Sequence, residues 1–249
     1  MYKFFVPGNQ IEEDIINIIG TDVNHISNVL RLKIDDEILV TNKDNEKTYL
    51  SKIVKFSKEN IICRIIKNKE DTTESNIYID IYQGLPKSDK MEYIIQKTTE
   101  LGVKNIIPVD MERCVVKIDK KSESKKIERW QKISEVAAKQ SKRDYIPKIG
   151  NIIKIEDICN ITSKYDIILL AYEDENKTTI KDELKRIKQK SDNKLKIGII
   201  IGPEGGVSEK EVNKLISSGI KCVSLGKRIL RTETAPIVMV SDIIYEFEL

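Results

Sequence analysis

Histidine and cysteine, on which many metal sites and hydrolase active sites depend, are scarce in this chain. Its 249 residues contain one histidine and four cysteines. The cysteines form no Cys-x-x-Cys pair and stand about fifty residues apart, at Cys63, Cys114, Cys159 and Cys222. This spacing argues against zinc ligation and against a dense disulfide framework. A Ser-His-Asp triad would have to use His25. We therefore expect no metal site, and most hydrolase chemistry is disfavoured.

Long apolar runs are also missing. Hydrophobic residues make up 40% of the chain and charged residues 33%, and no run approaches the roughly 18 apolar residues that span a bilayer. Near the start, Pro7 and Gly8 interrupt the chain before an apolar stretch of signal-peptide length develops. We expect a cytoplasmic protein without membrane insertion. The net charge of +3 permits an anionic partner without requiring one.

The first part of the chain has the pattern of short strands. Apolar residues alternate or cluster between polar turns, and a short helix is expected at residues 21–30. Residues 67–76 then contain no large apolar side chain, which is typical of a domain boundary. The sequence therefore predicts a small β-barrel over residues 1–70 and a second domain over residues 74–249. The strands expected in the barrel are 3–6, 37–41, 47–55 and 60–66.

Beyond this boundary, strands alternate with helices, which predicts parallel strands with crossover helices and thus an α/β domain. The expected strands are 77–82, 106–109, 166–171, 196–201 and 221–225. The expected helices are 90–101, 122–140, 179–189, 208–218 and 233–246. In open sheets of this kind, ligands bind at the carboxyl ends of the strands. The loops after the last three strands are therefore the candidate functional segments.

The loop after strand 196–201 is rich in glycine. Residues 202–206 read Gly-Pro-Glu-Gly-Gly, and Ser208 with Glu211 forms a capping box that begins a helix. Glycines let the backbone approach a ligand closely, although a plain tight turn explains the same residues. The loop lacks the patterns of a Walker A motif and of a dinucleotide site, so phosphate binding is only weakly indicated.

The loop after strand 221–225 combines arginines with aliphatic residues. Ile229 and Leu230 lie between Arg228 and Arg231, and Pro236 suits a first helical turn with Thr232 as its N-cap. Two interpretations are open. Either the aliphatic residues and fixed guanidinium groups line a pocket for an anionic guest, or the loop is packed and the arginines lie on the surface.

These two loops carry a resemblance to a known family. Residues 201–206, followed by residues 225–235, which read Leu-Gly-Lys-Arg-Ile-Leu-Arg-Thr-Glu-Thr-Ala, are similar to the signature pair of the RsmE family. Members of that family are S-adenosylmethionine-dependent methyltransferases of the SPOUT class that methylate N3 of one uridine in 16S ribosomal RNA. Further similar blocks follow the family order over nearly the whole chain: His25 with 29–31, 101–103 with Pro108, 112–113, 129–130, and 135–141 with Arg143.

The resemblance implies a fold, a cofactor and partners. It implies an N-terminal PUA-like barrel that binds RNA, a C-terminal SPOUT domain with a trefoil knot, a homodimer, and the 16S rRNA of the small ribosomal subunit as substrate. S-adenosyl-L-methionine would be bound by Leu170, Ala171, Gly202, Gly205, Gly206, Leu225, Gly226, Ile229, Leu230 and Thr234. RNA would be bound by Lys3, Arg31, Arg113 and Arg143. Lys3 stands where the family has an arginine.

The chemistry of the reaction suggests two catalytic residues. The N3 position of uracil becomes nucleophilic only as its proton leaves, so an anion must be stabilised in line with the methyl group. We expect Arg231 to stabilise that anion. Glu204 either accepts the proton or orients its loop by accepting backbone N–H bonds. Glu233 is expected to interact with the dipole of the last helix.

Basic residues in the middle of the chain suit phosphate contacts. Residues 117–126 carry five lysines against two acidic residues, although a solvated helix face explains this pattern equally well. Two alternative functions remain open. The protein is a related enzyme that methylates a ribose hydroxyl or another base, or it is an RNA-binding protein without catalytic activity.

Overall fold

The computed structural model describes residues 1–189 and 194–248. The chain forms two compact units, one of Met1–Glu74 with Ala138–Tyr145 and one of Ser75–Ala137 with Ile146–Leu249. Among the described residues, no helix has both the length and the apolar composition that a membrane crossing requires.

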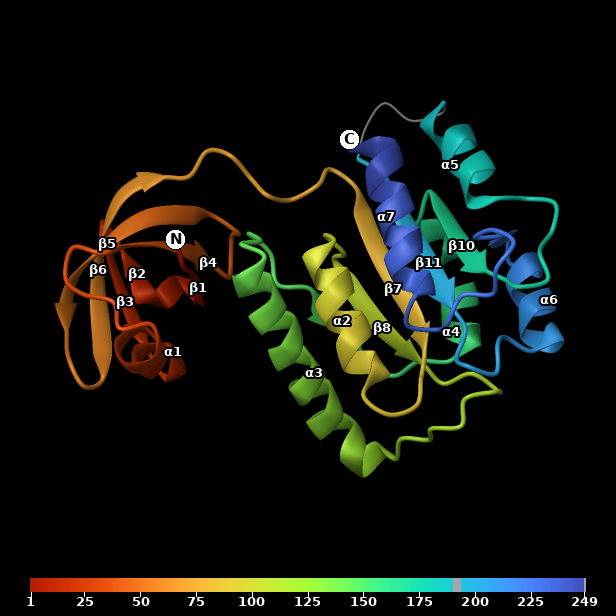
Figure 1. The fold of residues 1–249 in the computed structure, drawn as a ribbon, viewed down its shortest axis with the longest axis horizontal. Coiled ribbons are helices and arrows are strands. Elements are labelled where there is room, and N and C mark those ends of the chain that lie inside the picture. The colour runs from red at the N-terminus through yellow and green to blue at the C-terminus, as the bar shows by residue number, and fades with distance from the viewer. Residues whose placement is uncertain (190–193, 249) are drawn as a thin grey trace. The chain divides into compact units, whose positions relative to one another are not determined.

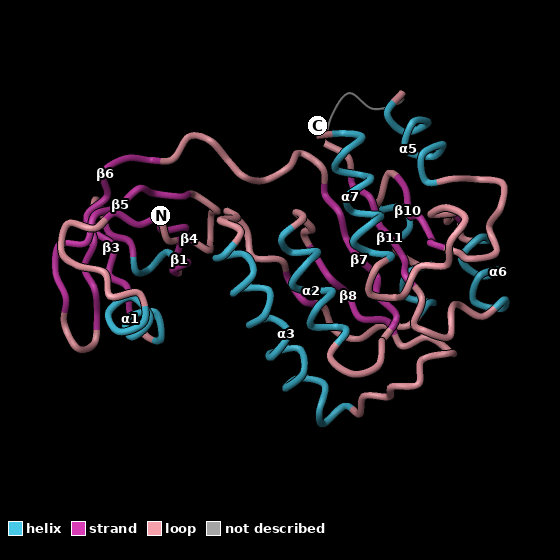
Figure 2. The backbone as a smooth tube through the Cα atoms, in the orientation of Figure 1, coloured by secondary structure: helices cyan, strands magenta, loops and turns pink. Residues whose placement is uncertain are grey.

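The first unit contains a curled six-stranded sheet in the order β1-β4-β5-β6-β3-β2 (Figure 2). In chain order its strands are β1 (Lys3–Val6), β2 (Ile11–Glu12), β3 (Ile15–Ile19), β4 (Glu37–Asn42), β5 (Thr48–Phe56) and β6 (Asn60–Asn68). The four expected strands are confirmed, whereas β2 and β3 were not expected. The predicted single helix consists instead of one α-helical turn, α1 (Thr21–Asn24), followed by a π-helical turn at His25–Val29.

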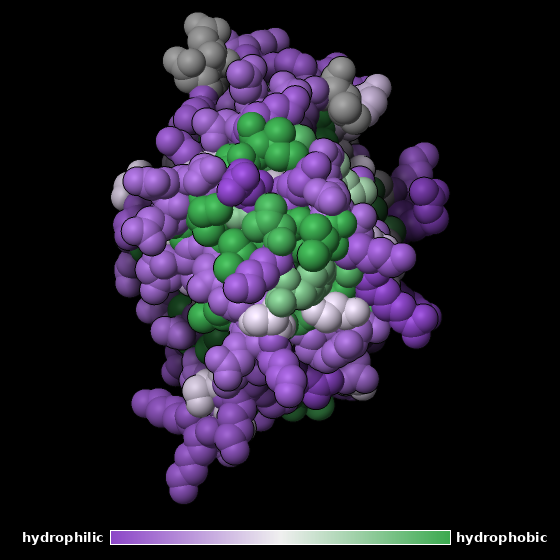
Figure 3. Space-filling model, turned by 90° about the vertical axis from the view of Figure 1, so that its left-hand side faces the viewer, coloured by the Kyte–Doolittle hydropathy of each residue, from purple (hydrophilic) through white to green (hydrophobic). Residues whose placement is uncertain are grey.

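Apolar side chains that alternate along these strands point to one side of the sheet and form the core of the first unit. Phe4, Ile16, Ile38, Ile53 and Ile61 are at most 1% exposed. Residues on the opposite side of the strands are also aliphatic in places, and Leu39, Leu50, Val54 and Ile62 are half-buried. Figure 3 shows apolar side chains gathered within a polar surround on one face of the molecule.

Residues 138–145 join the first unit through buried charges. The ammonium group of Lys3 forms an ion pair with Asp144, whose carboxylate also accepts hydrogen bonds from Thr48 Oγ1 at 2.6 Å and from the N–H of Thr73 at 2.8 Å. The guanidinium of Arg143 pairs with Glu74. Burial alone raises the pKa of Asp144, but these hydrogen bonds outweigh it and hold the pKa well below its ordinary value. The composition of residues 138–145 does not indicate that they pack with the first unit. Their position depends on individual ion pairs and hydrogen bonds with residues that are distant in the sequence.

The second unit contains a parallel six-stranded sheet in the order β12-β10-β11-β7-β8-β9. Its strands are β7 (Tyr78–Gly84), β8 (Asn105–Val109), β9 (Lys148–Ile149), β10 (Ile167–Ala171), β11 (Lys196–Ile201) and β12 (Lys221–Val223). The helices are α2 (Lys90–Glu100), α3 (Lys120–Gln140), α4 (Ile155–Cys159), α5 (Ile180–Lys188), α6 (Glu209–Ser217) and α7 (Ala235–Phe247), with short 3₁₀ turns at Gly8–Gln10 and Thr162–Lys164 elsewhere in the chain. The predicted parallel pairing is confirmed, and the short β9 and α4 are additional.

The arrangement of this sheet determines where its loops meet. β11 lies between β7 and β10, and β10 also pairs with β12, all in parallel. α2 and α7 lie side by side in front of the sheet in the view of Figure 1. Because parallel strands end at the same edge, the loops after β7, β10, β11 and β12 converge there.

Candidate active site

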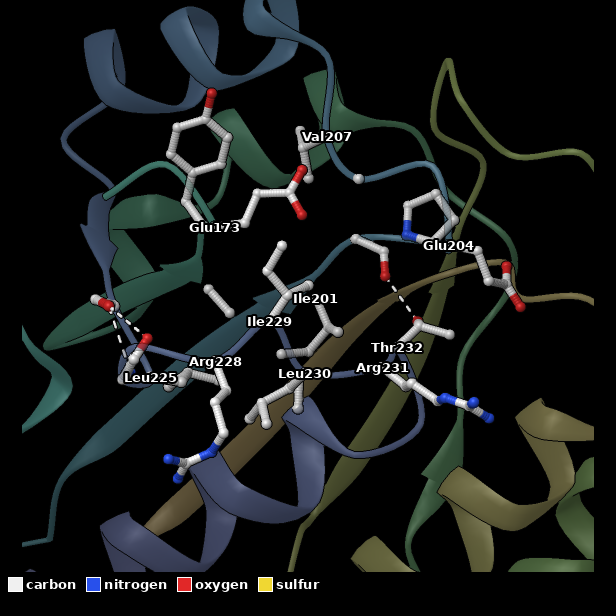
Figure 4. Close-up of a pocket in the computed structure, with 18 of the residues that line it drawn as sticks. Glu173, Ile201, Glu204, Val207, Leu225, Arg228, Ile229, Leu230, Arg231 and Thr232 are labelled. Carbon is white, nitrogen blue, oxygen red and sulfur yellow. Dashed lines mark hydrogen bonds between the residues drawn. The ribbon is translucent and has the colours of Figure 1, made fainter. Parts of the chain in front are cut away.

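A cavity of about 430 Å³ opens at this edge of the second unit (Figure 4). That volume lies in the range of small-molecule sites, which is roughly 300–1,000 Å³. Four segments line it: the beginning of α2, the end of β10 with the loop after it, residues 201–204 and 206–207, and residues 224–232 with Ala235 after β12. Both loops that the sequence singled out therefore belong to one pocket.

The Gly-Pro-Glu-Gly-Gly loop requires its glycines for steric reasons. A Cβ atom on Gly202 would lie 3.0 Å from Val207 Cγ2, and one on Gly206 would lie 3.0 Å from Glu173 Oε1. Gly206 also has a φ of +70°, which favours glycine. The predicted capping box of Ser208 and Glu211 is confirmed at the start of α6. The loop is thus a tight turn that also lines the cavity.

The second loop presents aliphatic and cationic side chains to the cavity. Ile229 is 81% exposed, and Figure 4 shows it beside Ile201. Arg228 and Arg231 are exposed and both line the cavity. Within residues 1–189 and 194–248, neither guanidinium group has a hydrogen bond or an ion pair in this structure. The exposed Ile229 does not fit the alternative of a packed loop, whereas exposed arginines are expected under both interpretations.

Thr232 is not the N-cap that we expected. Its hydroxyl is buried, donates a hydrogen bond to the carbonyl oxygen of Gly202 at 2.7 Å, and accepts one from Gln83 Nε2 at 3.0 Å. Helix α7 begins at Ala235 with Thr234 as its N-cap, and Pro236 lies in the first turn as predicted. The Thr232 hydroxyl therefore joins three segments of the site instead of capping the helix.

Most of the residues expected to bind the cofactor line the cavity. They are Ala171, Gly202, Gly206, Leu225, Gly226, Ile229 and Leu230, together with the two expected catalytic residues Arg231 and Glu204. Leu170 is fully buried within β10. Gly205 and Thr234 are not among the lining residues. The carbonyl oxygen of Gly205 instead accepts a hydrogen bond from the guanidinium of Arg113 at 3.1 Å.

Charged residues form a network at the rim. Lys90 Nζ lies 2.9 Å from Glu204 Oε1 and 3.1 Å from Glu233 Oε2, and both carboxylates raise the pKa of Lys90. Glu204 also accepts a hydrogen bond from the backbone N–H of Lys87 at 3.1 Å. Burial acts to raise the pKa of Glu204, but the hydrogen bonds from Lys90 and Lys87 lower it below its ordinary value. A carboxylate with a lowered pKa is a weak proton acceptor, so the geometry favours loop orientation for Glu204.

Sequence reasoning missed Lys90 and Gln83. The sequence contained a signal for both residues. β7 was expected as a parallel strand, so its carboxyl end and the residues after it should lie at the edge of the sheet where the other loops converge. Gly84 at that end also touches the glycine-rich loop, since a Cβ atom there would lie 2.7 Å from the backbone nitrogen of Pro203. The β7–α2 segment therefore contacts the glycine-rich loop and contributes Lys90 to the lining of the pocket.

Two of the expected RNA-binding residues are placed differently from the prediction. Lys3 and Arg143 are 3% exposed and pair with Asp144 and Glu74, so their charges are not available to phosphate groups. Burial without these carboxylates would be costly, which explains why the cations are paired. Arg31 is exposed, and Arg113 is exposed beside the glycine-rich loop.

Comparisons with known proteins agree with this architecture. The family model of an RNA methyltransferase domain matches residues 73–244, and that of an RNA methyltransferase PUA domain matches residues 18–66. The ribosomal RNA small subunit methyltransferase E of Bacillus subtilis is 37% identical over 253 residues, covering 100% of this chain and 98% of that protein. The protein of the same name from Buchnera aphidicola is 33% identical, covering 95% and 92%.

A solved structure shows the same fold. The ribosomal RNA small subunit methyltransferase E of Neisseria gonorrhoeae, bound to S-adenosyl methionine, superposes with a TM-score of 0.85 at 29% identity and covers 98% of this chain and 97% of that chain. The domain match covers more than half of the chain, and the Bacillus relative matches along its whole length. This chain therefore belongs to the RsmE family of RNA methyltransferases.

Proposed function

We propose that this protein transfers a methyl group from S-adenosylmethionine to N3 of a uridine in the 16S rRNA of the small ribosomal subunit. The observation that carries the proposal is the single cavity that both motif loops line. The named relatives act on small-subunit ribosomal RNA, and the related Neisseria structure binds S-adenosylmethionine. The enzyme would act in the bacterial cytoplasm, where ribosomal subunits are assembled.

The residues around the cavity fit this cofactor. Glycines at 202 and 206 leave backbone where a side chain would collide, and Ile201, Leu225 and Leu230 supply an apolar wall. Ala171, Gly226 and Ile229 complete the set that we propose to hold it. S-adenosylmethionine supplies an electrophilic methyl group with its own leaving group, so the transfer needs no metal.

Arg231 is our candidate for stabilising the base. Its guanidinium is permanently charged and is not engaged by other described residues. Negative charge that develops on uracil as the N3 proton leaves is stabilised by such a preorganised cation. Glu204 fits a positioning role, since its carboxylate joins Lys90 to the backbone of Lys87.

The two domains are proposed to divide the work. Residues 1–70 would form the PUA-like unit that helps to bind RNA, with Arg31 and Arg113 as contacts on the two domains. Residues 74–249 would bind the cofactor. We also propose that the C-terminal segment passes through a loop as a trefoil knot. The burial of Thr232 between Gln83 and Gly202 supports this, because it places the segment among loops from earlier strands.

A homodimer is proposed on the evidence of α7. Met239, Val240 and Ile243 are buried in the core of the second unit, yet Tyr245 is 72% exposed and Ile237 is only half-buried. The helix is therefore apolar on more of its circumference than this core covers. Light scattering at micromolar concentration should give the mass of two chains, and a mass of one chain would refute this part of the proposal.

Calorimetric titration with S-adenosylmethionine tests the cofactor assignment. We expect binding in the absence of added metal ions, with comparable binding of the demethylated product. A folded protein that binds neither compound would overturn the proposed function. An RNA-binding protein without catalytic activity would have no need of this pocket, so the same titration distinguishes the two functions.

A further inference from the structure

Three segments of the active site meet at one lysine. Lys90 begins α2, Glu204 lies in the glycine-rich loop, and Glu233 follows the arginine loop. The Lys90 ammonium is 2.9 Å from one carboxylate and 3.1 Å from the other. The side chains are 31%, 26% and 18% exposed in that order, so the cluster is only partly accessible to water.

One of the two carboxylates, Glu233, is close to Arg231 in the sequence. Glu233 lies two residues further along in the same turn, in which the N–H groups of Thr234 and Ala235 donate to the carbonyl oxygen of Arg231. Figure 4 shows the side chains of Glu204 and Arg231 extending toward the same side of the pocket. Nevertheless, Arg231 pairs with neither carboxylate.

Glu233 depends strongly on Lys90. Its Oε2 atom is buried and lacks a hydrogen bond to the described residues, which leaves the ion pair with Lys90 as its compensation. A partly buried carboxylate without a counter-ion is destabilised, and it would be drawn to the next available cation. In this turn that cation is the guanidinium of Arg231, which can bind a carboxylate through two parallel hydrogen bonds.

We infer that Lys90 is a positioning residue that engages Glu204 and Glu233 and thereby keeps Arg231 free for the anionic base. This inference rests on the proposed function, in which Arg231 stabilises the uracil anion. Lys90 does not contact the base in this scheme. It acts by preventing an internal ion pair that would compete with the substrate for the same guanidinium.

The size of the effect follows from this competition. If the internal pair forms, only the molecules with a free Arg231 are competent, and turnover falls to the fraction that these molecules make up. Ion pairs that are partly exposed are weak, so we expect a loss of about tenfold and not a complete loss of activity. Cofactor affinity should change by less than about threefold, because Lys90 affects the pocket only through charges at its rim.

The experiment compares four kinds of variant in methyl transfer to small ribosomal subunits. Lys90→Met should lower turnover about tenfold, whereas Lys90→Arg should keep near-normal turnover because it retains the charge. In the Lys90→Met background, adding Glu233→Gln should restore turnover by removing the competing carboxylate. Lys97→Met is the matched control, since it removes a paired lysine from the same helix at a pair with Glu100.

The rescue separates this role from a purely structural one. If Lys90 merely held the loops together, removing a carboxylate as well would not restore turnover. No rescue by Glu233→Gln, or a Lys90→Met variant that behaves like Lys97→Met, would overturn the inference.

A second measurement does not depend on activity. The side-chain Nε–H resonance of Arg231, observed by NMR, should shift and exchange more slowly with water in Lys90→Met, and return toward the wild-type position when Glu233→Gln is added. An unchanged resonance would overturn the inference. A wild-type protein that shows the expected Arg231 behaviour but transfers no methyl group would instead refute the proposed function, so the two failures are distinguishable.

Discussion

Two pairs of basic residues, one pair in each unit of this protein, lie in opposite environments. In the first unit, Lys3 and Arg143 are buried and paired with Asp144 and Glu74. In the second unit, Arg228 and Arg231 are exposed in a cavity and are not paired with other described residues. Cations with satisfied partners contribute to the fold, whereas an accessible and unpaired cation beside a cavity is available to a ligand.

This difference bears on two of the residues that were expected to bind RNA. The family resemblance implied RNA binding by Lys3 and Arg143, whose charges the structure shows to be buried and paired. Their partners are far away in the sequence, since Lys3 and Asp144 are 141 positions apart. Whether a charged side chain is buried depends on contacts with residues that are distant in the sequence. The residue type alone does not reveal these contacts. The following predictions test the comparison, beginning with the largest expected effect.

Replacing Asp144 with asparagine should destabilise the first unit strongly. The variant leaves the Lys3 ammonium buried without a counter-ion, which costs about 3–5 kcal/mol in comparable buried pairs. Urea unfolding measures this loss. The matched control is Asp35→Asn, which breaks an exposed pair with Lys52 at 3.5 Å and should cost less than about 1 kcal/mol. Equal effects of the two variants would show that the buried pair is not a stabilising element of the fold.

Arg231→Ala should lower activity strongly and leave stability nearly unchanged, in contrast to Asp144→Asn. Loss of the cation should lower turnover by roughly 10²–10³ with little change in cofactor affinity. Unfolding free energy should stay within about 0.5 kcal/mol of the wild type, because the side chain is exposed. Arg186→Ala is the control, since this arginine pairs with Glu183 on the surface of α5. Equal losses of affinity and turnover would make Arg231 a ligand of the cofactor carboxylate instead.

Gly206→Val should affect cofactor affinity more than turnover at saturation. A side chain there meets Glu173 at the cavity and adopts a strained φ of +70°. We expect affinity to fall roughly ten- to hundredfold, which calorimetry can measure. Gly219→Ala separates strain from volume, because Gly219 has a φ of +89° with no atom within 4 Å of the added Cβ. If Gly219→Ala weakened cofactor binding to the same extent, the loss would reflect backbone strain.

The pH dependence of stability gives a smaller test. Asp144 has a lowered pKa in the folded protein, so its contribution is fully present above the unfolded value of about 3.9 and is lost as pH falls through the folded value. The difference in unfolding free energy between wild type and Asp144→Asn should therefore be constant from pH 7 to about pH 5. It should narrow only in more acidic solution. A difference that narrows between pH 7 and pH 5 would contradict the lowered pKa.

Local patterns accounted for most of the second unit and less of the first. Alternating apolar segments indicated its central strands, and the Ser208 capping box indicated the start of α6. Elements of two to five residues, such as β2, β9 and α4, contain too few positions to show a period. The pocket loops were identifiable from glycine and arginine motifs. The roles of Lys90, Gln83 and Thr232 depend on contacts between loops that are distant in sequence.

The most direct test is to locate the methyl group. The purified protein would be incubated with labelled S-adenosylmethionine and small ribosomal subunits from cells that lack it, and the RNA would be digested and analysed by mass spectrometry. The account predicts one methyl group at N3 of a single uridine in 16S rRNA, and a strong decrease with Arg231→Ala. A methyl group on a ribose hydroxyl or another base, or cofactor binding without any transfer, would contradict it.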